Sequence, residues 1–146
     1  MKIKVMLDPG AKMPTKAYET DAGFDLYAKT DIDPVYMTRG SGATFDTGVH
    51  FEIPKGYVGF LMSKSGLNVI GGMTSTGVID ASYSGSVVVR LYKHIRTEND
   101  FGTIINPGQK ISQIVFLPIP DVELEEVDSI EETGRGNRGF GSTGAF

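Results

Sequence analysis

The chain has 146 residues, a length that fits one domain with its own apolar core, and a net charge of -4 at pH 7. This acidic balance argues against a broad basic face for duplex nucleic acid, so we expect no stable nucleic-acid binding. The chain has no cysteine, no signal-peptide-like start and no apolar run of membrane-spanning length, which predicts a soluble cytoplasmic protein without disulfides, thiolate chemistry or a membrane segment.

The apolar side chains recur mostly every two residues rather than every 3.6, which is typical of strands. In chain order, strands are predicted at residues 2–5, 57–61, 86–92 and 110–117, and a short helix with Ser63 as candidate N-cap at residues 63–70. The 19 glycines and 7 prolines interrupt the chain at short intervals. Together these features predict an all-β fold, a sandwich or a barrel.

The C-terminal segment differs from the rest of the chain in composition. It is acidic after Pro120 and rich in glycine from about residue 133 onward, with too few apolar residues to fold alone. We therefore expect a β domain over residues 1–132 and a flexible Gly-rich arm over residues 133–146.

The glycines of this arm have GxGxxG spacing, but no strand precedes them and no helix follows, which argues against a dinucleotide fingerprint. Two interpretations stay open. One is a plain flexible terminus. The other is an arm in which Arg135 and Arg138 offer forked donors to phosphate while Phe140 offers a stacking face.

The segment GVIDASYSG, at residues 77–85, places an acid between the end of an apolar strand and a turn. Asp80 could simply cap that turn through backbone amides. Alternatively, Asp80 faces a pocket and activates a water while Tyr83 packs on a sugar ring, provided that phosphate donors converge nearby. The candidate donors lie near the start of the predicted helix, where the helix dipole favours anions; they are Lys64, Ser65 and Gly66.

Asp21 and Asp25 flank a glycine-containing turn. Such a pair can hold a hydrated magnesium ion, because hard cations prefer oxygen ligands, and it can equally stabilise the turn. His50 and His94 lack the spacing of a zinc site, so we expect both to be structural or solvated. The Walker phosphate loop and the HxE with PCxxC pattern of zinc nucleobase deaminases are also absent from the sequence.

Five segments, in this order, resemble the motifs of the trimeric dUTP diphosphatase (dUTPase) family: AGFDLYA at 22–28, SKSGL at 63–67, GVIDASYSG at 77–85, GQKISQ at 108–113 and RGNRGFGSTG at 135–144. Each motif is weak alone, but the ordered set spans nearly the whole chain. The resemblance implies a jelly-roll-like β barrel with a flexible C-terminal arm, and a homotrimer with three shared active sites. A phage or a Gram-positive bacterial type is left open.

The activity that the resemblance implies is hydrolysis of dUTP to dUMP and pyrophosphate, assisted by Mg²⁺. This reaction limits uracil incorporation into DNA and supplies dUMP for dTMP synthesis. By the same resemblance, Asp80 is the general base that orients water for attack on the α-phosphorus. Tyr83 packs under the deoxyribose, and Asp25 holds the water shell of the magnesium ion.

The resemblance also implies contacts with the base and the phosphates. A hairpin of Gly77, Val78 and Ile79, preceded by Thr74 where an Asn is common, pairs with uracil through its backbone. Phosphate contacts fall to Lys64, Ser65, Gly66 and Gln113, and the arm contributes Arg135, Phe140, Gly141, Ser142 and Thr143. Lys64 stands where Arg is usual, so a point charge replaces a bidentate fork. Likewise, Ser82 replaces a usual Asp and Arg138 a usual Gly.

Two alternative functions remain on the sequence alone. A dCTP deaminase of the same fold needs a Glu near the base, and none accompanies the segment at residues 77–85. A nucleotide-gated regulatory protein could keep the dUTPase scaffold and control a protein partner. An intact Asp80 and Arg135 favour catalysis, with a regulatory partner as an added role.

Overall fold

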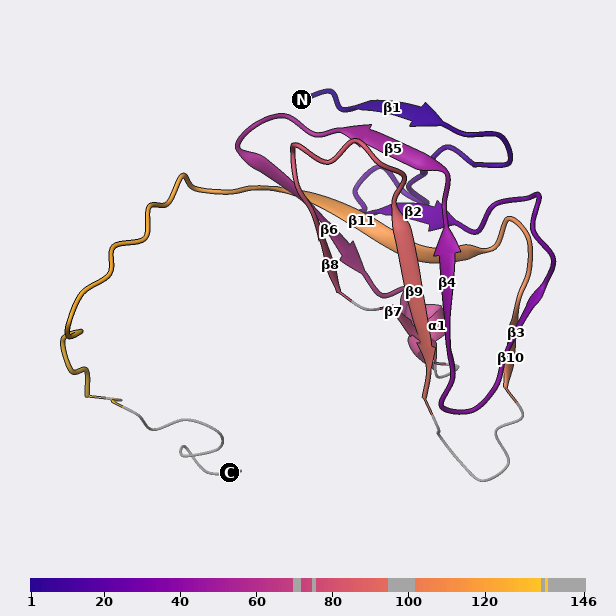
Figure 1. Ribbon diagram of the computed structural model, residues 1–146. Helices are drawn as coiled ribbons and strands as arrows, with labels where there is room; N and C mark the ends of the chain where they lie inside the picture. Colours follow the sequence, from indigo (N-terminus) through magenta and orange to yellow (C-terminus); the bar gives the residue numbers. More distant parts are fainter. Residues whose placement is uncertain (70–71, 75, 95–101, 135, 137–146) are drawn as a thin grey trace.

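Strands make up almost all of the regular structure in this computed structural model, which describes residues 1–69, 72–74, 76–94, 102–134 and 136. Within those ranges the helical structure is one short element, α1 (Ser65–Val69). The all-β fold class predicted from the sequence is confirmed. Figure 1 shows the strands packed together, with the N-terminus beside β1 and residues 119–134 leading away from the sheets.

The four-stranded sheet carries most of the predicted site segments. Its order is β2-β11-β6-β8, formed by β2 (Phe24–Tyr27), β11 (Lys110–Pro118), β6 (Tyr57–Met62) and β8 (Gly77–Ile79). All neighbouring strands are antiparallel. Because β11 pairs with both β2 and β6, motifs that lie far apart in the sequence become neighbours in space.

The other strands form smaller antiparallel sheets. The three-stranded sheet has the order β4-β9-β7, formed by β4 (Gly42–Asp46), β9 (Val88–Lys93) and β7 (Gly72–Thr74). Two further pairs complete the described sheets: β1 (Lys4–Leu7) with β5 (Val49–Glu52), and β3 (Val35–Met37) with β10 (Thr103–Ile105). In Figure 1, β1 and β5 lie at the top of the molecule and β3 and β10 at its right.

One hydrophobic core cluster among the described residues joins these sheets. Strand β9 alternates strictly, so that Val89 and Leu91 are buried while Val88 and Arg90 face outward. The core also receives Ile111 and Ile114 from β11 and Leu26 from β2, and all three are fully buried. Burial of one such side chain contributes about 1.5–3 kcal/mol. The arrangement matches the jelly-roll-like barrel expected from the sequence.

Strand and helix boundaries differ little from those predicted. Strands β6 and β11 begin where the sequence places them and extend one residue further. By contrast, β1 and β9 each begin two residues later than predicted, because the pairing of β1 with β5 starts at Lys4 and that of β9 with β4 starts at Val88. Helix α1 is shorter than predicted: its first helical hydrogen bond runs from Asn68 N to Lys64 O, so Lys64 rather than Ser63 is the cap residue.

Beyond β11 the chain leaves the sheets. Residues 119–134 contain no strand or helix and extend away from the barrel (Figure 1). Their start is tied down by a hydrogen bond from Ile119 N to Gly56 O (2.9 Å). Leu124, further along, is 96% exposed. Of the predicted arm at 133–146, the structure describes only residues 133, 134 and 136. Across the described ranges, no helix has the length and hydropathy required to cross a bilayer.

Candidate active site

A buried carboxylate organises the first cluster of predicted site residues. Asp25, on β2, is only 7% exposed, and it accepts hydrogen bonds from Lys64 Nζ (2.8 Å) and Lys110 Nζ (2.6 Å). Strand register explains the meeting: Gln113 of β11 lies opposite both Asp25 and Met62. Lys64 follows Met62 by two residues and therefore reaches the same point.

The charges of this cluster favour the ionised carboxylate. Burial opposes ionisation of Asp25, but the hydrogen bonds and charges of Lys110 and Lys64 outweigh it and hold the pKa of Asp25 below its ordinary value of 3.8. In turn, the hydrogen bond and the charge of Asp25 raise the pKa of Lys110 above 10.5. With two lysines facing one carboxylate, the cluster is net positive, which suits an anionic ligand.

Substitution of Asp25 by Asn should lower the free energy of unfolding by about 1–3 kcal/mol at pH 7, because two ammonium groups lose their charged acceptor. The lysine side chains are about one-third exposed and can turn to water, which keeps the loss moderate. Since the pKa of Asp25 is lowered by folding, its contribution is present above pH 3.8 and is lost as the pH falls through the lower folded value. Urea unfolding of parent and variant at pH 7 and below pH 3.8 measures this.

The matched control is Asp31→Asn. Asp31 is half-exposed and lies 3.7 Å from Lys29 Nζ, so we expect its replacement to change stability by less than about 0.5 kcal/mol. A variant Asp25→Asn that is as stable as the parent at pH 7 would show that the buried ion pairs do not stabilise the fold.

Two glycines border the same cluster, one tightly packed and one open. A side chain on Gly23 would bring a Cβ within 2.6 Å of Gln113 Oε1, and Gln113 Nε2 donates to Ser63 O (3.1 Å). Gly66 has open space around its Cα, since a Cβ there would meet nothing within 4 Å. Ser65 and Gly66 are both exposed. A ligand can therefore approach the backbone of this segment closely.

Asp21 does not join Asp25. Its carboxylate accepts hydrogen bonds from the backbone N–H groups of Ala17 (3.1 Å) and Tyr18 (2.9 Å). Of the two interpretations of the acid pair, turn stabilisation thus applies to Asp21. Within the described ranges, no group of three or more His, Asp or Glu side chains is placed to hold a metal ion.

The second cluster lies around β8. This strand pairs with β6 and is the last strand of its sheet, so among the described residues one row of its backbone N–H and C=O groups faces no other strand. Gly77, Val78 and Ile79 make up the strand. Thr74 lies instead on β7, opposite Leu91 of the three-stranded sheet.

A tight turn follows β8. Tyr83 N donates to Asp80 O (3.0 Å) and the Tyr83 hydroxyl donates to Ser86 O (2.9 Å). The tyrosine ring folds back over Gly85, where a Cβ would overlap its hydroxyl. Tyr83 is 44% exposed, and Asp80 is exposed without a side-chain partner in the described part of the chain. Both side chains are accessible to a ligand.

The two clusters do not meet within one chain. Ile79 lies opposite Gly59, so Asp80 is next to the start of β6, whereas Lys64 lies beyond the other end of that strand. At about 3.3 Å per residue the separation along β6 is roughly 20 Å. The predicted arm residues Arg135, Phe140, Gly141, Ser142 and Thr143 lie outside the described residues.

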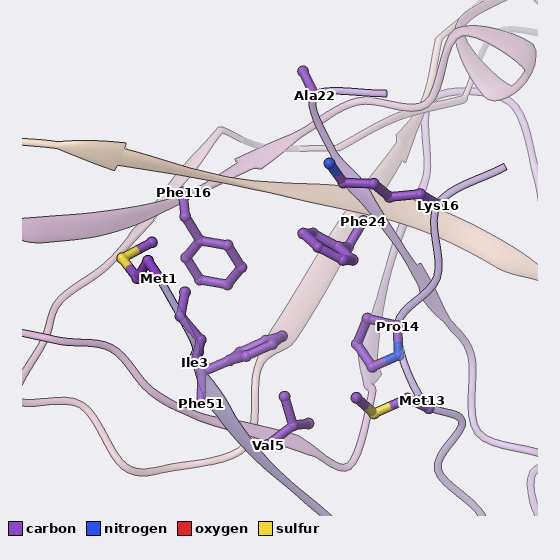
Figure 2. Close-up of a pocket in the computed structure, with 10 residues that line it drawn as sticks. All are labelled: Met1, Ile3, Val5, Met13, Pro14, Lys16, Ala22, Phe24, Phe51 and Phe116. Atoms are coloured by element: carbon purple, nitrogen blue, oxygen red, sulfur yellow. The ribbon is translucent and has the colours of Figure 1, made fainter. Parts of the chain in front are cut away.

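An apolar hollow of about 300 Å³ lies between β1, β5 and the chain before β2 (Figure 2). Phe24, Phe51 and Phe116 point into it, and the charged residue among those that line it is Lys16. The Lys16 ammonium lies 4.9 Å from the centre of the Phe24 ring. A triphosphate needs several cations, so this hollow does not suit one.

Sequence reasoning missed two polar contacts near these clusters. Lys110 was not singled out, although it lies in the GQKISQ segment. Its position on a strand, three residues before Gln113, is only a weak signal that it contacts Asp25. His50 was expected to be structural or solvated, and the structural role is the one observed, since its ring bonds the turn after β8. No sequence signal identifies that contact, since it depends on how β1, β5 and the turn pack together.

Comparison with known proteins decides the family. A family model described as dUTPase matches residues 10–144, almost the whole chain. The chain belongs to the dUTPase family. Among its relatives, the deoxyuridine 5'-triphosphate nucleotidohydrolase of Saccharomyces cerevisiae is 39% identical over 145 residues, covering 97% of this chain and 94% of the relative. That of Clostridium tetani is 38% identical and covers 99% and 96% of the two chains.

Solved structures agree with the sequence relatives. A mutant of the Staphylococcus bacteriophage 80alpha dUTPase with dUpNHpp has a TM-score of 0.83 and 29% identity, covering 98% of both chains. A mutant dUTPase from phage phi11 of S. aureus, which coordinates a structural Mg(II) ion, has a TM-score of 0.76 and 28% identity, covering 88% of this chain and 98% of that one. The chain is therefore a hydrolase of the dUTP diphosphatase class, as predicted.

Proposed function

We propose that this dUTPase cleaves dUTP to dUMP and pyrophosphate by attack of a water on the α-phosphorus, with Asp80 accepting the water proton. The observation that carries this assignment is the exposed carboxylate of Asp80, directly after β8, which has no side-chain partner among the described residues. Such a carboxylate can orient a water and take up its proton. The reaction needs no covalent nucleophile, in keeping with a chain that has no cysteine.

In this proposal the edge of β8 that no described strand pairs with recognises the base. Backbone N–H and C=O groups of Gly77, Val78 and Ile79 can pair with the edge of uracil as a complementary base would. Cytosine reverses the donor and acceptor order and would leave buried polar groups unpaired, which is costly. Thymine adds a methyl group that a close-fitting strand edge excludes. Thr74, at the end of β7, is assigned to the segment that leads into β8.

The Asp25 cluster is the proposed phosphate end. Lys64, Ser65, Gly66 and Gln113 would contact the phosphates, joined by Arg135 of the arm. Lys64 and Lys110 both bond Asp25, so the carboxylate stays paired with Lys110 when Lys64 turns to a phosphate. This arrangement lets a lysine serve where the family more often has an arginine.

Magnesium fits this end of the site through water. A carboxylate offers about four acceptor positions, of which the two lysines use part, so Asp25 can still hold a water of a hydrated ion. Mg²⁺ keeps several waters and is commonly bound by substrate phosphates with one or two carboxylates. The bound ion would neutralise charge on the phosphates. The phi11 dUTPase coordinates a structural Mg(II) ion, which supports magnesium as a metal that a relative can bind.

Because Asp80 and Lys64 of one chain lie roughly 20 Å apart along β6, we assign them to different active sites. In a homotrimer, the Asp80 and Tyr83 end of one subunit would face the Lys64 and Gln113 end of another. The proposal divides the chain into a barrel over residues 1–132 and an arm over residues 133–146. The arm would close the active site of a neighbouring subunit. Phe140, Gly141 and Ser142 would cover the nucleotide.

The proposed location in the cytoplasm rests on the composition of the chain, which has no cysteine. A cytoplasmic dUTPase would limit uracil incorporation into DNA and supply dUMP for dTMP synthesis.

Replacement of Tyr83 by Ala should relax sugar selection, because deletion of the ring opens space for a 2′-hydroxyl. The measurement is pyrophosphate release from dUTP, dCTP, dTTP and UTP with Mg²⁺. The parent should strongly prefer dUTP over all three others, whereas Tyr83→Ala should reduce the ratio of kcat/KM for dUTP to that for UTP by about tenfold or more.

Tyr83→Phe is the matched control, since it keeps the ring and loses only the hydrogen bond to Ser86 O. It should retain the discrimination. An unchanged dUTP to UTP ratio in an active Tyr83→Ala enzyme would remove Tyr83 from sugar selection, and a parent that releases ammonia from dCTP would point to the deaminase-like alternative.

A further inference from the structure

His50 joins two separate segments of the barrel. Its side chain is 18% exposed, on β5 opposite Met6 of β1. Nδ1 lies 2.8 Å from the backbone oxygen of Ser84, in the turn after β8, and Nε2 lies 3.1 Å from Oδ2 of Asp8. The imidazole therefore bridges the end of β1 and the turn that carries Tyr83.

Both partners of this imidazole are acceptors. A peptide carbonyl and an ionised carboxylate each require an N–H donor, and a neutral imidazole has only one. Only the imidazolium, with N–H groups at Nδ1 and Nε2, satisfies Ser84 and Asp8 together. After the proton is lost, the imidazole has one N–H group for two acceptors. It can therefore keep the hydrogen bond to Ser84 or to Asp8, but not both.

We propose that His50, as the imidazolium, is a positioning residue that fixes the turn carrying Tyr83, and that this enzyme aligns the turn less well once His50 loses its proton. The residue touches neither reacting atom nor substrate in this proposal. It acts through the turn. Only the kinetic test of this inference rests on the proposed contact of Tyr83 with the sugar.

The turn depends on this bridge because few other hydrogen bonds of the described residues connect residues 81–84 to the sheets. Residues 81–84 are exposed and border a hollow of about 460 Å³, whose other walls come from β1 and β5. Hydrogen bonds made by Tyr83 reach only Asp80 and Ser86, at the ends of the same turn. Ser86 in turn donates to Asp46. Within the described ranges, the bond to His50 is thus the one that ties residues 81–84 to another strand.

The charged groups around His50 favour its protonated form. Asp8 follows β1 and Asp46 ends β4, and the negative charge of each favours the imidazolium. Lys4 and Glu52 line the same hollow but pair with each other at 3.1 Å, so their charges offset. Lys29 lies near enough to Asp46 to weaken that acid's effect.

The hydrogen bond to the Ser84 carbonyl, followed by that to Asp8, raises the pKa of His50 above its ordinary value of 6.5, although burial opposes this. A group whose pKa is raised by folding stabilises the native state fully below the unfolded value. Its contribution is lost as the pH rises through the folded value. The bridge is therefore complete below pH 6.5 and is lost above the raised pKa.

Two NMR titrations of the full-length enzyme test the bridge without reference to activity. The chain has two histidines, which simplifies assignment of the imidazole signals. In the parent, the backbone amides of residues 81–84 should shift with the same midpoint as the His50 ring. Asp8→Asn should lower that midpoint. Amides that do not follow the His50 titration, or a midpoint that Asp8→Asn leaves unchanged, would overturn the proposal.

Kinetics then tests the consequence. In the parent, the ratio of kcat/KM for dUTP to that for UTP should fall about three- to tenfold as the pH rises through the His50 midpoint, the size expected for one lost hydrogen bond. His50→Gln, which cannot donate at both ends as a cation, should show the low ratio throughout and no step. His94→Gln, a matched change at an exposed histidine, should behave like the parent.

The outcomes separate this inference from the proposed function. A parental ratio and parental pH step in His50→Gln would overturn the positioning role. A parent that does not discriminate dUTP from UTP at any pH would instead contradict the role of Tyr83, and the amide titration would still decide whether His50 holds the turn.

Discussion

Asp80→Asn is expected to bind dUTP with nearly parental affinity and to lose turnover by about 100- to 10,000-fold. The amide keeps the size and shape of the carboxylate but lacks the basic oxygen that accepts the water proton. Because Asp80 is exposed and unpaired among the described residues, its replacement should leave the fold intact. Steady-state kcat and the equilibrium affinity for dUTP separate the two effects.

Asp33→Asn is the control for loss of one exposed negative charge, and it should retain parental kcat. If Asp80→Asn turns over dUTP at a rate comparable to the parent, Asp80 is not the base.

Deletion of residues 134–146 is expected to leave a folded trimer with almost no activity, at least about 100-fold below the parent. The deletion removes the proposed phosphate donor Arg135 and the stacking ring Phe140, and preorganised charge of this kind supplies much of the catalysis in phosphoryl transfer. The described chain already leaves the sheets at residue 119, so the barrel should retain its stability. Thermal unfolding, sedimentation and pyrophosphate release measure these three properties.

Removal of only residues 145 and 146 is the matched control. These two residues follow the RGNRGFGSTG segment and lie beyond the range matched by the dUTPase family model. Parental activity is expected. An enzyme without residues 134–146 that keeps full activity would show that the arm has no catalytic role.

The sequence predicts the long strands well and the short ones poorly. Strands β6 and β11 are apolar over most of their length, with Gly59 interrupting β6, and the predicted and observed ranges nearly coincide. Strands β3 and β10 have three residues each, too few for a periodicity to stand out. Strand β1 is mostly exposed, and its start is set by pairing with β5 rather than by its own side chains.

The proposed site residues came from local motifs, whereas their spatial relations required the fold. Asp25 and Gln113 were identified within their motifs, but the meeting of Asp25 with Lys110 depends on the register of β2 against β11. His50 lies 34 residues before Ser84, and no spacing rule connects them. Likewise, only the pairing of β8 with β6 reveals that Asp80 and Lys64 lie at opposite ends of one strand.

The most direct test of a shared dUTP-cleaving site is pyrophosphate release by mixed trimers of Asp80→Asn subunits and subunits lacking residues 134–146. Neither homotrimer should turn over. With random assembly from equal amounts, each site takes its Asp80 and its arm from different subunits, so roughly a quarter of the sites should be intact by symmetry. Activity should therefore reappear at about that fraction of the parent. Mixed trimers that stay inactive, although each variant is folded and binds dUTP, would contradict a site shared between subunits.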